Sequence, residues 1–170
     1  LVRAGLLCLL FSLTLGCEDP RGSYAKPYDH KRDLKGGTLV FSDDFEREKV
    51  GPSWSENPRW TIKDGRLHIA NDHNKGLWLL KELPDNARVE FDALSPTPEG
   101  DLKCEIFAAE PVHQAGYVLI FGGWDNRINV IARLDEHGED RKEERERKVV
   151  QNKVHKFTII RRGRNLVWYL

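Results

Sequence analysis

Residues 115–136 read AGYVLIFGGWDNRINVIARLDE, and they hold the strongest strand signal of the chain. Residues 117–121 are apolar on both faces, and residues 128–134 are nearly so, with two polar interruptions. Continuous apolar runs of this kind are typical of strands in the middle of a packed sheet. A glycine-rich turn between the two runs carries Trp124. We therefore expect two central strands joined by a turn that exposes this indole.

The clearest local signal outside this region is a hairpin over residues 60–69. Apolar residues alternate on both sides of Asp64-Gly65. This pair favours a type I′ turn, because both central positions of that turn need a positive φ. The sequence therefore predicts two short antiparallel strands here.

Short apolar or alternating segments continue the β pattern along the rest of the chain. Further strands are expected at residues 38–41, 77–80, 88–93, 101–108, 157–160 and 166–170. Turn residues separate about ten short strands, and no segment has a convincing helical period. We therefore predict an all-β fold, a two-sheet antiparallel jelly-roll sandwich.

A run of mixed charges over residues 141–148 has two interpretations. It could form a short helix with ion pairs four residues apart, or a solvated sheet edge or long loop. Its alternating signs place it on the surface in either case.

Composition excludes some classes of function. The chain of 170 residues has 27 Lys and Arg against 27 Asp and Glu, so its formal net charge is zero. No global field favours nucleic acid, and none is expected as a partner. Cys104 is the one cysteine after residue 17, so no internal disulfide is expected, and its place in an alternating strand indicates a buried side chain.

The N-terminus reads as a targeting segment. Arg3 precedes a short apolar run at residues 4–15, too short to span a bilayer, and Gly16 directly precedes Cys17. This resembles a bacterial lipoprotein signal peptide whose cysteine is lipidated after cleavage, although Thr14 stands where that family prefers leucine. The alternatives are an ordinary secretory leader and a buried N-terminal helix. The resemblance implies attachment to a membrane through the lipid on Cys17, in the bacterial cell envelope, at an outer membrane facing the periplasm or the cell surface.

The sequence divides into three parts. Residues 1–17 are the expected leader, and residues 18–36 are polar, with prolines and no apolar period, which is typical of a flexible spacer. Residues 37–170 form the expected β-sandwich domain. Because the chain stops within an expected strand, we expect the natural protein to be longer.

Five segments, taken in order, resemble a known family. They are FSDDF at 41–45, WTIKDGRL at 60–67, RVEFD at 88–92, GYVLIFGGW at 116–124 and WYL at 168–170. Together they resemble bacterial concanavalin A-like (laminin-G-like) jelly-roll domains, which include uncharacterised secreted families and the 3-keto-disaccharide hydrolase group. The resemblance covers residues 37–170 and implies a convex and a concave sheet, with ligands on the concave face or the loops beside it.

The resemblance does not extend to a catalytic motif. Retaining glucanases of this fold carry Glu-x-Asp-x-x-Glu on one strand. Here Glu90 and Asp92 are followed by Ala93, Leu94 and Ser95, so the third carboxylate is missing. Glycosidase activity is therefore in doubt.

Strand parity gives a candidate ligand site. Glu90 and Asp92 share one face, as do Lys103 and Glu105, and as do Arg133 and Asp135. If these strands are neighbours in the concave sheet, their charges form a cluster with Trp124, Asn126 and Arg127 at its rim. A sugar suits such a site, because carboxylates and amides bind hydroxyls and an indole packs on the sugar ring.

Other interpretations stay open. The same residues could be cross-strand ion pairs on a solvated face, each worth under ~1 kcal/mol. Glu90, Asp92 or Glu105 could serve as acid and base in a glycoside-acting hydrolase, and the domain could be a structural or adhesive envelope module. The histidines have no metal-ligand spacing, and we expect neither metal nor cofactor. Carbohydrate binding is the function that we expect first.

Overall fold

The computed structural model describes residues 30–70 and 72–170. The predicted leader, the lipid attachment at Cys17 and the spacer as far as residue 29 lie outside the described residues. Within the described part the protein is all-β with antiparallel sheets, as predicted. That part contains no helix with the length and hydropathy needed to cross a membrane.

Nine strands follow a short 3-10 helix. The elements are η1 (His30–Leu34), β1 (Thr61–Lys63), β2 (Arg66–His68), β3 (Ala87–Ala93), β4 (Leu102–Ile106), β5 (Tyr117–Gly122), α1 (Gly123–Asn126), β6 (Ile128–Arg133), β7 (Lys142–Glu144), β8 (His155–Arg162) and β9 (Asn165–Tyr169).

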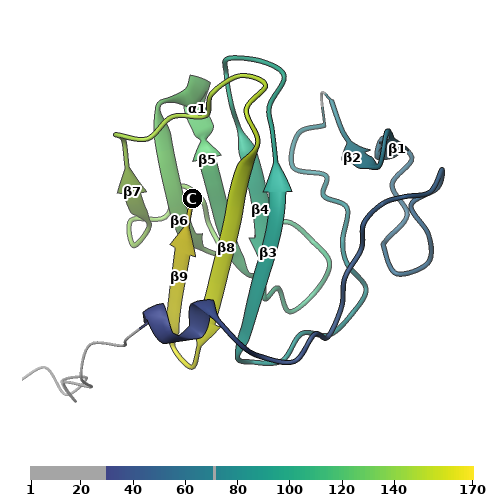
Figure 1. Cartoon of the computed structure of the whole chain (residues 1–170). Coiled ribbons are helices and arrows are strands. Elements are labelled where there is room, and N and C mark those ends of the chain that lie inside the picture. The colour runs from purple at the N-terminus through teal and green to yellow at the C-terminus, as the bar shows by residue number, and fades with distance from the viewer. Residues whose placement is uncertain (1–29, 71) are drawn as a thin grey trace, which may run out of the picture.

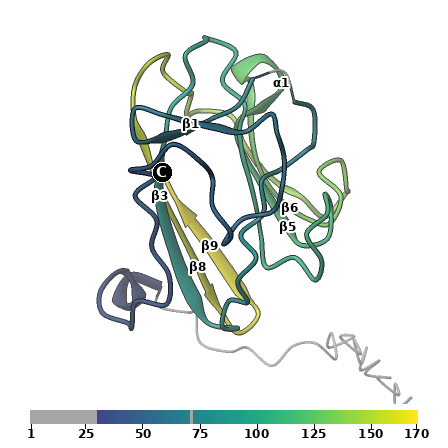
Figure 2. The ribbon, with the colours of Figure 1, turned by 90° about the vertical axis from the view of Figure 1, so that its right-hand side faces the viewer.

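The strands form three antiparallel sheets. One sheet has the order β3-β8-β9, the second has the order β4-β5-β6-β7, and β1 pairs only with β2. Figures 1 and 2 show the two larger sheets as two layers, with the β1–β2 hairpin to one side of them. This arrangement is compatible with an all-β sandwich.

Apolar side chains from both layers meet between the two larger sheets. Leu119 of β5 packs with Ile159 of β8, and both are fully buried. Beside them, Phe121 makes edge-to-face contacts with Phe157 and Trp168. We call this side of the four-stranded sheet its inner face and the opposite side its outer face.

The two central strands are confirmed as β5 and β6. They pair antiparallel, and both of their faces are buried, as the apolar runs predict. On the outer face, Val118, Ile120, Val130 and Ala132 form a second apolar cluster and are at most 2% exposed. The outer face therefore has an apolar floor on which other side chains rest.

The predicted hairpin at residues 60–69 is also confirmed. β1 pairs with β2 across Asp64 and Gly65, whose φ angles are 51° and 64°. These two positive angles are those that a type I′ turn requires.

Two predicted strands are wrong. Residues 38–41 pair with nothing as a strand, and Leu39 is 78% exposed. Residues 77–80 supply only one isolated bridge, from Leu79 to Trp54. A strand is stabilised by the ladder that it forms with a neighbour, and apolar alternation alone does not provide that neighbour.

The structure also shows where the charged run and the end of the spacer lie. Lys142–Glu144 forms β7, which pairs with β6 at the edge of the four-stranded sheet, so the edge interpretation is correct. The end of the predicted spacer is fixed to the three-stranded sheet through Asp33 of η1. Its carbonyl accepts a bond from Arg88 Nη1 at 2.9 Å, and its carboxylate accepts one from Arg162 Nη2 at 3.1 Å.

Candidate functional site

The structure separates the predicted charge cluster into two sheets. Glu90 and Asp92 lie on β3, whose partner is β8, and they stand opposite Thr158 and Lys156. Lys103 and Glu105 lie on β4, in the other sheet. Parity indicates which residues of a strand share a face, but it does not indicate which sheet the strand joins. The prediction that these four charges meet is therefore wrong.

Arg133 and Asp135 do not join Lys103 and Glu105 either. Arg133 stands opposite Tyr117, whose side of β5 is the inner one, whereas Lys103 stands opposite Ile120 on the outer face. The Arg133 side chain is 68% exposed and lies 3.5 Å from a carboxylate oxygen of Asp140. Asp135 accepts a bond from the His137 backbone at 2.8 Å. Both residues serve the turn that follows β6.

Lys103 meets other partners on the outer face. Its Nζ lies 2.7 Å from Oε2 of Glu136 and 2.8 Å from Oδ1 of Asn74. Glu136 is only 7% exposed, because the loop after β6 folds back over the sheet. A buried carboxylate needs such a partner, since leaving it unpaired costs several kcal/mol.

Glu105 is the centre of a second polar contact on the same face. Its side chain is 10% exposed, and its two oxygens contact His113 Nδ1 and the Gln114 backbone amide. The other ring nitrogen of His113, Nε2, is buried and has no hydrogen-bond partner among the described residues.

Trp124 completes the outer face toward β6 and β7. Its indole is half-buried against the apolar cluster that includes Val130, rather than exposed as predicted. The His137 ring meets it edge-on at 5.6 Å, and the Arg141 guanidinium lies over it at 5.3 Å. Arg141 is held in turn by the Glu136 carbonyl at 2.8 Å. A cation over an indole is a favourable pair worth about 1 kcal/mol or less where water reaches it.

These side chains form a set above the apolar floor of the outer face, in which Glu105 and His113 are a pair separate from the contacts around Glu136 and Trp124. We call this set the outer-face cluster, and it consists of Lys103, Glu105, His113, Trp124, Glu136, His137 and Arg141. Of its members, the sequence identified Lys103, Glu105 and Trp124.

The turn that carries Trp124 has an uncommon backbone. Trp124, Asp125 and Asn126 all have left-handed φ angles, between 53° and 60°. For residues with a Cβ this conformation costs roughly 1–2 kcal/mol each, and such strain often lies at functional sites. α1 is therefore a left-handed turn that presents the indole to the outer face.

Asn126 and Arg127 hold this turn and do not face the outer-face cluster as free groups. The Asn126 amide donates to the carbonyls of Val149 and Pro98 at 2.7 and 3.0 Å, and its oxygen accepts from the Val149 amide at 2.9 Å. Arg127 Nε donates to the Trp124 carbonyl at 2.6 Å. Both were predicted as ligand-binding residues, but in the structure their side chains bond to the backbone and stabilise the turn.

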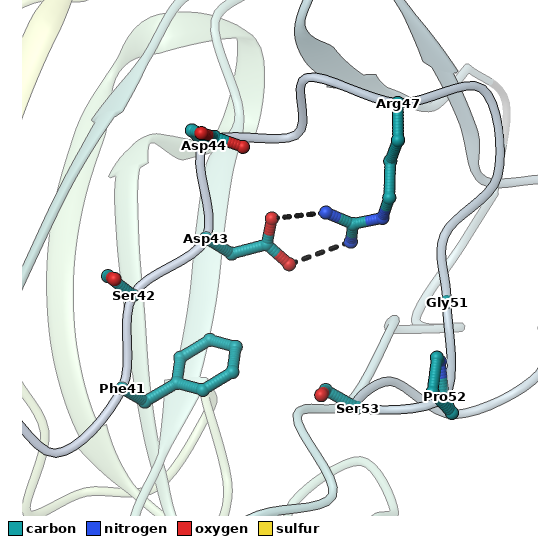
Figure 3. A pocket seen from close by; sticks show the side chains of 8 residues that line it. All are labelled: Phe41, Ser42, Asp43, Asp44, Arg47, Gly51, Pro52 and Ser53. Carbon is teal, nitrogen blue, oxygen red and sulfur yellow. Dashed lines mark hydrogen bonds and ion pairs between the residues drawn. The ribbon is translucent and has the colours of Figure 1, made fainter.

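A separate hollow of about 500 Å³ lies in the segment before the first hairpin. Figure 3 shows the paired side chains of Asp43 and Arg47 among those that line it. Asp43 accepts two bonds from Arg47, at 2.5 and 2.7 Å, and one each from the Trp54 indole and the Phe45 amide, at 2.8 and 2.9 Å. The Arg47 bonds hold the pKa of Asp43 well below its usual range. None of the lining residues belongs to the outer-face cluster, and Asp43 is already saturated, so we assign this acid a structural role.

The described part of the chain contains neither a group of metal ligands nor a reactive thiol. No three His, Cys, Asp or Glu residues gather there as ligands for an ion. Cys104 faces the core, and burial raises the pKa of its thiol to about 12, so it stays protonated at neutral pH.

Known proteins give no guide to this site. Comparison of the chain with models of protein families, with characterised proteins and with solved structures produced no match.

Proposed function

We propose that the chain is a lipid-anchored protein of the bacterial cell envelope whose jelly-roll domain binds carbohydrate on the outer face of the four-stranded sheet. The observation that carries this proposal is the outer-face cluster, in which an indole, two carboxylates, a lysine and two imidazoles share one face. Ligand sites combine apolar surface with a few convergent polar groups in this way.

The chemistry of the cluster matches that of a sugar. Carboxylates and imidazoles accept hydrogen bonds from hydroxyls, while Lys103 and Arg141 donate to ring and hydroxyl oxygens. The Trp124 indole supplies the apolar surface against which the C–H groups of a sugar ring pack. Since the Arg141 guanidinium lies over this indole, a sugar that packs there must displace it or extend beyond its edge.

The proposed fold type rests on the resemblance to concanavalin A-like domains. In that family the concave sheet binds ligands, and we assign that part to the β4-β5-β6-β7 sheet. The two antiparallel layers are compatible with this assignment.

A glycoside-acting hydrolase is the alternative that one observation favours. Glu105 contacts a histidine, an arrangement that can give or take a proton. Glu90 and Asp92 lie on the other sheet and cannot act together with it at one bond. An enzyme at this site would therefore use Glu105 and His113, with Glu136 as the second carboxylate. A structural or adhesive envelope module is the third candidate and needs no ligand at the cluster.

A glycan array with a parallel hydrolysis readout separates these functions. The protein is the full chain carrying Cys17→Ala, which removes the proposed lipid. Retention of a glycan without cleavage is the expected result. Cleavage would establish the enzyme instead, and a folded sample that neither binds nor cleaves would leave the structural module.

A further inference from the structure

One ring nitrogen of His113, in the outer-face cluster, is left without a partner among the described residues. Nδ1 of this ring contacts a Glu105 oxygen, and Nε2 is buried without a hydrogen-bond partner among the described residues. A buried polar atom left without a partner costs about 1–3 kcal/mol, so a native structure rarely keeps one without a reason.

The contact with Glu105 determines what Nε2 can do. Glu105 already accepts the backbone amide of Gln114 at 2.9 Å, so its carboxylate acts as an acceptor at this place. A neutral imidazole whose Nδ1–H donates a hydrogen bond to a carboxylate has a lone pair on Nε2. Nε2 is then an acceptor, and the group that satisfies it must be a donor.

We propose that a hydroxyl of the bound sugar donates to Nε2 of His113 and that Glu105 is the positioning residue of this imidazole. The inference rests on the proposed function and extends the ligand site from β6 to β4. Glu105 stands opposite Val118 near the start of β5, and Trp124 follows the other end of that strand. Four residues of β5 lead from Val118 to Gly122, so the ends of the site lie at least about 13 Å apart along this strand. Because Nε2 is buried, the proposal requires that the hydroxyl displaces a side chain that covers this nitrogen.

Nitrogen NMR of the imidazole and indole groups tests this inference in the full chain carrying Cys17→Ala. The probes are trisaccharides of D-glucose, D-galactose, D-mannose and D-xylose, each long enough to span the site, added singly at pH 8. We expect His113 to be in the Nδ1–H tautomer and its Nε2 signal to move with at least one probe, together with the Trp124 indole signal. A Trp124 shift without a His113 shift would overturn the inference and leave the proposed function. If neither signal moves with any probe, both are overturned.

Affinities of single-residue variants for the probe test whether Nε2 of His113 accepts the hydrogen bond. His113→Phe should weaken binding of the most effective probe about tenfold, which is the loss of one hydrogen bond. His113→Gln keeps an acceptor near the place of Nε2 and should restore most of the affinity. His68→Phe, in the separate hairpin, is the matched control and should bind as the parent does. Glu105→Gln should lower the Nδ1–H tautomer fraction, which a purely structural role would leave unchanged. Equal affinity of the parent and His113→Phe would overturn the proposal even if Glu105→Gln destabilises the fold.

Discussion

Asp43 shows how much one saturated carboxylate can stabilise a segment with almost no regular structure. Residues 35–60 contain no strand, yet this side chain ties together Arg47, Trp54 and the Phe45 amide. Hydrogen bonds to a charged group are worth roughly 1.5–3 kcal/mol, more than those between neutral groups. The acid is therefore a fastening point for the segment that precedes the first hairpin.

Replacement of Asp43 by asparagine should lower the stability of the fold. Asp43→Asn keeps the shape but removes the charge, and its amide group cannot accept from Arg47 and Trp54 at both positions. We expect the free energy of unfolding to fall by about 2 kcal/mol in urea denaturation. Asp44→Asn is the matched control, because Asp44 is exposed and accepts one backbone bond, from Glu46, and it should change the value by less than about 0.5 kcal/mol. Equal effects of the two variants would contradict the role of Asp43.

The same acid predicts a pH dependence. Its pKa is lowered in the folded state, chiefly by Arg47, so the folded protein holds the charged form more strongly than the unfolded chain does. Its contribution to stability is fully present above the unfolded pKa, about 3.9, and is lost as the pH falls toward the folded pKa. The difference in unfolding free energy between the parent and Asp43→Asn should be constant from pH 7 to 5 and shrink below about pH 4. A difference that grows on acidification would contradict this sign.

Of the individual residues in the outer-face cluster, the sequence predicted only some. Lys103 and Glu105 were identified because a strand period places alternate residues on one face. His113 and Glu136 were missed because both lie in loops that fold back onto the sheet, where no period applies. One signal was available, since Glu136 lies two positions after the predicted strand that ends at residue 134, and His113 lies four positions before the one that begins at residue 117.

The left-handed turn between β5 and β6 is the element on which the account depends most. Four of its residues, Gly122 and residues 124–126, have positive φ angles, and Asn126 bonds it to the chain at Val149 and Pro98. Asparagine suits this position for two reasons: its side chain makes these bonds, and it tolerates the left-handed conformation better than most residues.

Two substitutions separate the two roles of Asn126. Asn126→Gly should lose the side-chain hydrogen bonds but keep the backbone, and we expect a loss of about 2 kcal/mol in unfolding free energy. Asn126→Ala loses the same bonds and also strains the backbone, so its loss should be about 1 kcal/mol greater. Denaturation of both variants measures the difference. An alanine variant as stable as the glycine variant would show that the left-handed conformation does not persist in solution.

Strand prediction succeeded where the pattern and the pairing agree. The pairs β1–β2, β5–β6 and β8–β9 carry both an apolar pattern and a turn that brings the partner strand to them. Residues 38–41 carry the pattern alone, and in the structure Leu39 is exposed. The sheet to which β3 belongs depends on contacts with β8, more than 60 positions away, which no local pattern contains.

For the whole molecule, the proposed anchor gives a separate prediction. Cys17 and the leader lie outside the described residues, and η1, where the described part begins, is bonded to the three-stranded sheet. Cys17→Ala should move the protein from the membrane fraction to the soluble fraction and abolish labelling by a fatty-acid precursor. Cys104→Ala is the control and should leave both unchanged. Membrane association that persists without Cys17 would contradict lipid anchoring.

The central claim is that carbohydrate binds on the outer face of the four-stranded sheet, and calorimetric titration of two tryptophan variants tests it most directly. The titrant is a glycan retained by the parent protein on the array, and circular dichroism confirms that each variant is folded. Trp124→Ala should weaken binding at least about tenfold, roughly 1.4 kcal/mol. Trp54→Ala removes a half-buried indole that contacts Phe41, Phe45 and Asp43, none of them in the outer-face cluster, and should bind as the parent does. Unchanged affinity in a folded Trp124→Ala variant would contradict the claim and place the ligand elsewhere on the protein.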